Sequence, residues 1–121
     1  MSFNTQGMVF GLAIAASALA SPATASDGVH DGAAILRMCQ GGEKVKALSM
    51  MCHSYLNGYL DTIVWQAQKA GGGKSAFCLG AGDKKGLPGK LVLWLRAHPM
   101  ESNRPAPELL GKALKDLFPC R

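Results

Sequence analysis

The clearest pattern in the sequence is a long apolar stripe between residues 43 and 70. At 100° per residue its members fall within an arc of roughly 140°, which is typical of a helix packed on one side against a core. Three consecutive glycines follow, a common way for a helix to end. The pattern therefore predicts a helix over 43–70 whose buried face carries Val45, Leu48, Cys52, Tyr55, Leu56, Tyr59, Leu60, Ile63 and Ala67.

Shorter apolar patterns predict further helices on either side of this one. A helix capped by Asp31 or Asp27 should run through Gln40. Another should span 88–98, because LVLWL at 91–95 has no partner strand elsewhere and reads best as a central, buried helix. The last should span 107–118, where apolar residues recur on a single face.

The connections between these helices are rich in glycine and proline. Residues 71–89 hold seven glycines and are expected to form a flexible loop, and 100–104 is expected to be a polar loop. No hairpin signal or internal repeat is present in the sequence. We therefore predict an all-α fold, a small bundle of four to five helices.

The first 25 residues differ from the rest of the chain because they carry no charged side chain and no histidine. Residues 8–20 are apolar and precede an A-x-A site at 23–25, as in a secretory signal peptide. A buried helix or an uncleaved anchor are the alternatives. We expect cleavage after Ala25, a domain over 26–121 without a membrane span, and a periplasmic location.

Export makes disulfide bonds the expected state of the four cysteines, Cys39, Cys52, Cys78 and Cys120. Among three pairings we favour Cys39–Cys52, which links two successive helices, and Cys78–Cys120, which ties the central loop to the C-terminus. Closing these loops is worth about 3 and 4 kcal/mol in the chain-entropy model. Because a domain of this size buries only about 60–65% of its unfolded surface, both bonds would matter for stability.

A second and weaker stripe lies on the long helix, away from its main face. Met51, Gly58 and Trp65 are spaced seven residues apart and nearly align. A glycine between bulky apolar side chains permits close approach of another helix, so the stripe is a candidate homodimer contact. The alternative is that Trp65 covers a loop of its own domain.

The sequence lacks the motifs of the common enzyme classes. It contains neither H-E-x-x-H nor G-x-S-x-G, and its histidines lie beside no free nucleophile. We expect no catalytic residue, no metal site and no cofactor, and we interpret Asp61 as a solvated carboxylate. We interpret the net charge of +5 as a solubilising surface, with attraction of an acidic protein partner as the alternative. The interleaving of basic and aromatic residues typical of nucleic-acid binding is missing from the sequence.

The order and spacing of several short motifs resemble the Tai-type amidase-immunity family of bacterial type VI secretion. The resemblance covers about residues 31–120. It rests on C…C-x-x-Y-x-x-G-x-x-D, followed by motifs near the third and fourth cysteines. The matching residues of the first motif are Cys39, Cys52, Tyr55, Gly58 and Asp61, with Phe77-Cys78, the segment 95–99 and the terminal segment 113–120 after them.

This resemblance implies an exported, helical, dimeric protein that is not an enzyme and that blocks the active site of a peptidoglycan amidase effector. Tyr55 and Gly58 read as scaffold. For the contact with the partner we favour the turn between two prolines, formed by Met100, Glu101, Ser102, Asn103 and Arg104. The alternatives are a small periplasmic acid-stress chaperone of the HdeA-like type and a structural envelope protein.

Overall fold

A computed structural model describes residues 29–72 and 75–121, so the expected signal peptide lies outside the described residues. The elements follow in the order α1 (Gly32–Gly41), α2 (Lys46–Lys69), α3 (Asp83–Ala97), the single 3-10 turn η1 (Pro99–Glu101) and α4 (Ala106–Leu117). In this described part, β structure is limited to one isolated bridge between Asp31 and Pro105. The prediction of an all-α fold with four to five helices is confirmed.

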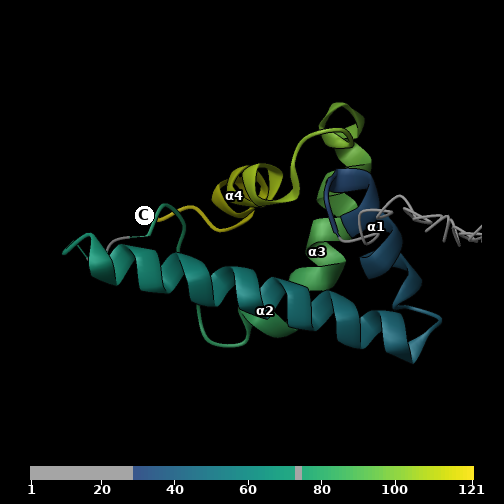
Figure 1. Cartoon of the computed structure of the whole chain (residues 1–121), viewed down its shortest axis with the longest axis horizontal. Helices are drawn as coiled ribbons and strands as arrows, with labels where there is room; N and C mark the ends of the chain where they lie inside the picture. Colours follow the sequence, from purple (N-terminus) through teal and green to yellow (C-terminus); the bar gives the residue numbers. More distant parts are fainter. Residues whose placement is uncertain (1–28, 73–74) are drawn as a thin grey trace, which may run out of the picture.

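Helix α2 is the longest of the described helices, and the other three pack along it (Figure 1). Helices α1 and α3 lie against each other and cross α2 toward one of its ends, while α4 lies over its middle. The C-terminus lies near the C-terminal end of α2, whereas the segment joining α3 to α4 lies at the top of the view, on the side of α1 and α3 that faces away from α2. The two regions therefore offer separate surfaces.

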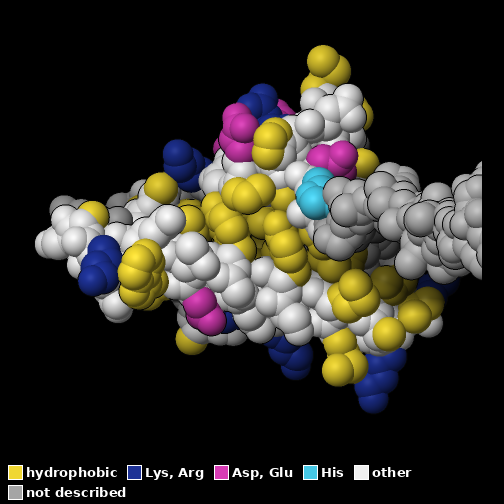
Figure 2. Space-filling view, in the orientation of Figure 1, with side chains coloured by type: hydrophobic (Ala, Val, Ile, Leu, Met, Phe, Trp, Pro, Cys, Tyr) yellow, Lys and Arg dark blue, Asp and Glu magenta, His cyan; other side chains and the backbone are white. Residues whose placement is uncertain are grey.

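One apolar core joins all four helices, and Figure 2 shows hydrophobic side chains gathered between α2 and α4. From α2 it takes Cys52, Leu56 and Leu60, with Tyr55, Tyr59 and Ile63 packed at its margin. The predicted buried face of this helix is thus largely confirmed, although Val45 precedes the helix and is exposed. The most deeply buried large side chains from the other helices are Ile35, Leu87, Leu91, Leu109, Leu110 and Leu114.

The prediction for the third helix was wrong at its start. Helix α3 begins at Asp83, five residues before Pro88, and so takes in part of the expected flexible loop. Gly82, with a φ of 84°, turns the chain into the helix, and the Asp83 carboxylate accepts a hydrogen bond of 2.6 Å from the amide of Gly80. Leu87 is almost fully buried, so its burial favours helix despite the neighbouring glycines and proline.

Both predicted disulfide bonds are present. Cys39–Cys52 joins the last turns of α1 to α2 inside the core, and Cys78–Cys120 ties the segment after α2 to the C-terminus at the surface. The Cα atoms of the two pairs are 5.0 and 4.9 Å apart. One bond thus links the first two helices, and the other links the segment after α2 to the end of the chain.

Candidate functional site

The turn between α3 and α4, residues 99–104, is the most distinctive surface feature and is called the 99–104 turn below. Pro99 and Pro105 bound it, and η1 forms its first half. Met100 is 90% exposed, whereas Glu101 beside it is only 5% exposed. The turn therefore presents an apolar side chain to solvent while a carboxylate turns inward.

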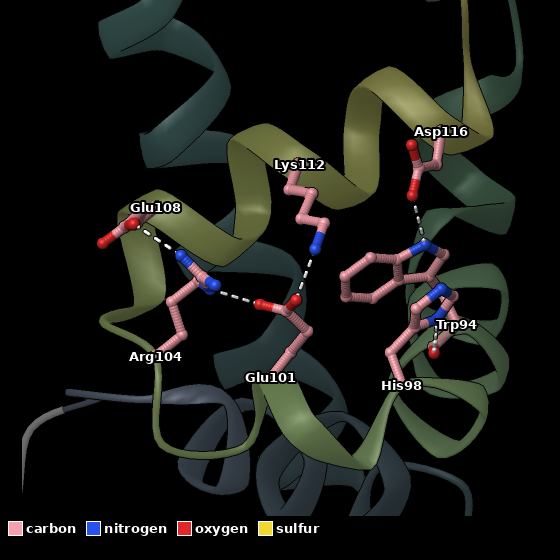
Figure 3. Close-up of polar contacts among 7 residues, drawn as sticks. All are labelled: Trp94, His98, Glu101, Arg104, Glu108, Lys112 and Asp116. Atoms are coloured by element: carbon pink, nitrogen blue, oxygen red, sulfur yellow. Dashed lines mark hydrogen bonds and ion pairs between the residues drawn. The ribbon is translucent and has the colours of Figure 1, made fainter.

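The inward carboxylate organises a network of charged side chains (Figure 3). Glu101 accepts a hydrogen bond from Arg104 within the turn and one of 2.5 Å from Lys112 on α4. Arg104 also donates to Glu108 on α4, with 2.7 Å between the atoms. The bond from Lys112 does most to hold the pKa of Glu101 below its ordinary value, and Arg104 adds to this against the opposing effect of desolvation.

The backbone of the turn is fixed to the start of α1. The amides of Gly32 and Ala33 donate to the carbonyls of Arg104 and Ser102, at 3.2 and 3.0 Å. These are two of the helix N-terminal amides that have no partner within the helix. Asp31 caps the same helix by accepting from the amide of Ala34 at 2.9 Å, which confirms the predicted cap.

A stack of rings supports the other end of the turn. The rings of Trp94 and His98 lie 4.1 Å apart between centroids, and Nδ1 of His98 is 2.8 Å from the carbonyl oxygen of Trp94. The indole N–H of Trp94 donates to Asp116 of α4 at 3.1 Å (Figure 3). The start of the turn is thus held by contacts with α3, and through Trp94 with α4.

The residues predicted for partner contact consequently divide into two kinds. Met100 and Asn103 are exposed, whereas Ser102 is half-buried. Glu101 is buried and, with Arg104, is engaged in the network. The buried role of Glu101 was missed because its partner Lys112 is distant in sequence; the Arg104–Glu108 spacing of four residues was the one local signal.

The residues of the motif on α2 lie in different environments. Tyr55 packs at the margin of the core, and burial raises its pKa. Asp61 is exposed, as expected. Tyr59, which the motif does not single out, is the residue that reaches another helix: its hydroxyl donates to the carbonyl of Pro107 at 3.2 Å.

The second stripe of α2 faces solvent. Met51 is 54% exposed and Trp65 is 58% exposed, with Nζ of Lys69 5.8 Å from the centre of the Trp65 ring. A Cβ added at Gly58 would meet nothing within 4 Å. Within the described residues, this stripe is therefore an apolar strip that the domain itself leaves open.

The described part of the chain offers neither a metal site nor a membrane-spanning helix. No group of three or more His, Cys, Asp or Glu side chains is arranged to hold a metal ion. Within residues 29–72 and 75–121, no helix has both the length and the apolarity needed to cross a bilayer.

Comparison with known proteins identifies the family. The model of a family described as Rap1a immunity proteins matches residues 31–120, from the cap of α1 to the last cysteine. Comparisons with curated proteins and with solved structures give no match. The resemblance to the Tai-type family is thereby confirmed as far as immunity in type VI secretion, although the matched family is Rap1a.

Several expectations follow from this match. Immunity proteins of this family are not enzymes; they act in the periplasm, and membership implies binding and neutralisation of a type VI secretion effector. Two disulfide bonds agree with an oxidising compartment. The match favours this function over an acid-stress chaperone or a structural envelope protein. The chain belongs to the family of Rap1a immunity proteins.

Proposed function

We propose that this immunity protein neutralises a peptidoglycan amidase effector by inserting the 99–104 turn into the catalytic cleft. The observation that carries the proposal is the 90% exposure of Met100 at the tip of a turn fixed from both sides. A rigid turn loses little conformational freedom on binding, so more of the contact energy appears as affinity. An apolar tip also suits the buried centre of a protein interface.

The side chains of the turn have separate tasks in this proposal. Met100 enters the cleft, and Asn103 supplies polar contact at its edge. Glu101 and Arg104 are positioning residues, because their charges are neutralised within the domain by Lys112 and Glu108. Loss of either positioning residue lowers affinity through the shape of the turn.

The test is inhibition of an amidase effector encoded beside this protein, measured as release of peptides from purified peptidoglycan. Met100→Asp places a charge at the tip and should weaken inhibition at least about tenfold, as for a central contact residue. Met50→Asp, at another exposed methionine, on α2, is the matched control and should inhibit normally. Full inhibition by Met100→Asp would refute insertion of the turn.

The stripe of Met51, Gly58 and Trp65 is proposed to be a homodimer contact. Its exposure and the open space above Gly58 support this, because a second helix could approach closely there. Trp65→Asp should then halve the mass measured by sedimentation, while Leu93→Asp, at an exposed leucine of α3, should leave it unchanged. A monomeric wild-type protein, or a dimeric Trp65→Asp variant, would contradict the proposal.

The N-terminal segment is proposed to be a signal peptide removed after Ala25. The A-x-A sequence at 23–25 supports this position. Intact-mass measurement of the protein from the periplasm should give a chain that begins at Ser26. A chain that retains residues 1–25 there would contradict cleavage.

A further inference from the structure

A groove separate from the 99–104 turn lies between the second half of α2 and the C-terminal segment. It has a volume of about 730 Å³. Its floor and walls are mainly apolar, formed by Leu60, Ile63, Val64, Phe77, Leu79 and the Cys78–Cys120 disulfide. Volumes of a few hundred to a thousand Å³ with mostly apolar walls are typical of sites for small ligands.

Two cationic side chains, Lys84 and Arg121, also line the groove. Among the residues that the structure describes, neither forms an ion pair with a carboxylate. Lys84 lies in the first turn of α3, where the helix dipole adds positive potential and the neighbouring Asp83 carries a negative charge. An apolar groove with unpaired cations is complementary to a molecule that has an apolar body and an anionic head.

The main-chain groups of the wall argue against an extended peptide as the occupant. The amide of Cys78 donates to the carbonyl of Phe118 at 2.8 Å, and the amide of Phe77 points to Ser75 Oγ at 3.5 Å. Peptides that bind beside an open backbone edge depend on such groups being available. A ligand that needs only apolar contact and one anion site does not depend on free main-chain groups.

We propose that this groove binds a single-chain amphipathic carboxylate of the fatty-acid class. The acyl chain lies against Leu60, Ile63 and Val64, and the carboxylate lies near Lys84 and Arg121. The site lies beside the C-terminal half of α2, away from the segment between α3 and α4 (Figure 1), so it is independent of the function proposed for the 99–104 turn.

The test is calorimetric titration of the oxidised protein, purified from a bacterial periplasm, with dodecanoate below its micellar concentration. Dodecyltrimethylammonium has the same chain with the opposite charge, and hexanoate has the same head with a shorter chain. We expect both to bind at least about tenfold more weakly than dodecanoate, because each removes one of the two contributions. Amide chemical shifts should change at 60–64 and 77–79.

Variants with matched controls locate the site. Val64→Asp and Lys84→Glu should each weaken dodecanoate binding by about tenfold, because one places a charge on the apolar wall and the other removes a cation. Val45→Asp, an exposed valine at the other end of α2, and Lys85→Glu, the exposed neighbour of Lys84, should bind normally. Circular dichroism confirms that each variant is folded.

Three results would overturn the proposal. Equal binding of dodecanoate and dodecyltrimethylammonium would show that the cations do not select the head. Unchanged binding by Val64→Asp and Lys84→Glu would place the ligand elsewhere. Absence of dodecanoate binding would exclude the ligand class. This would hold even if groove variants weakened binding to an effector or to vesicles of anionic phospholipid, because the groove would then have another occupant. None of these depends on whether Met100→Asp affects inhibition.

Discussion

Gly32 packs closely against the 99–104 turn, and its replacement by alanine tests how tightly the turn is held. An added Cβ would lie 2.7 Å from the carbonyl oxygen of Glu101 and 2.9 Å from Cδ2 of Leu109. The first of these is a backbone atom, so relief requires the turn to move. Gly32 has an ordinary helical φ, so the alanine backbone itself is unstrained.

The expected loss of stability follows from two opposing contributions. Overpacking of a close contact lowers the free energy of unfolding by about 1–3 kcal/mol. The higher helix propensity of alanine returns at most about 1 kcal/mol, and less at the first position of a helix. Gly32→Ala should therefore lower the free energy of unfolding by about 1–2 kcal/mol and also weaken inhibition of the effector.

Urea unfolding followed by circular dichroism measures this change, with Gly86→Ala as the matched control. A Cβ at Gly86, within α3, meets nothing within 4 Å, so alanine there should raise the free energy of unfolding by about 0.5–1 kcal/mol. The two glycine substitutions thus have opposite expected signs. A Gly32→Ala variant that is as stable as Gly86→Ala would refute the claim that the turn is held against α1.

Further predictions concern the charged network and the disulfide bonds. Glu101→Gln should destabilise the domain at neutral pH, where the carboxylate is ionised. Because the folded-state pKa is lowered, the difference from wild type should shrink as pH falls below about 4, and thermal unfolding across pH measures this; a difference that is constant with pH would contradict the assignment. Replacing Cys78 and Cys120 by alanine should lower the free energy of unfolding by about 4 kcal/mol in the chain-entropy model. Because that pair is exposed and Cys39–Cys52 is buried, mild reductant followed by thiol labelling should modify Cys78 and Cys120 first, and prior labelling of Cys39 would speak against the described burial.

Elements whose determinants are local in sequence could be predicted well. The cap at Asp31, the apolar face of α2 and the single-faced last helix all depend on residues within a few turns of one another. The last helix was predicted to within one residue at each end. The disulfide pairing also followed from the order of the predicted elements. Cys39–Cys52 joins two successive helices, and Cys78–Cys120 joins the central loop to the C-terminus.

Features that depend on distant residues could not be predicted. Glu101 was assigned to a polar loop, and its burial becomes favourable only where α4 brings Lys112 to the turn. The start of α3 was missed because glycine and proline are usually helix breakers, and the burial of Leu87 that outweighs them is a tertiary effect. The groove beside Cys78–Cys120 could not be predicted either, because its walls come from three separate segments: α2, residues 75–84 and the C-terminus.

The hydrogen bonds from the start of α1 to the 99–104 turn join segments that are synthesised far apart in time. Residues 29–33 leave the ribosome early, but their partners at Ser102 and Arg104, and Lys112 beyond them, leave nearly last. A chain cut or stalled before α4 therefore has no finished turn, whatever else has folded. The contact surface proposed above is therefore complete only after α4 has been synthesised.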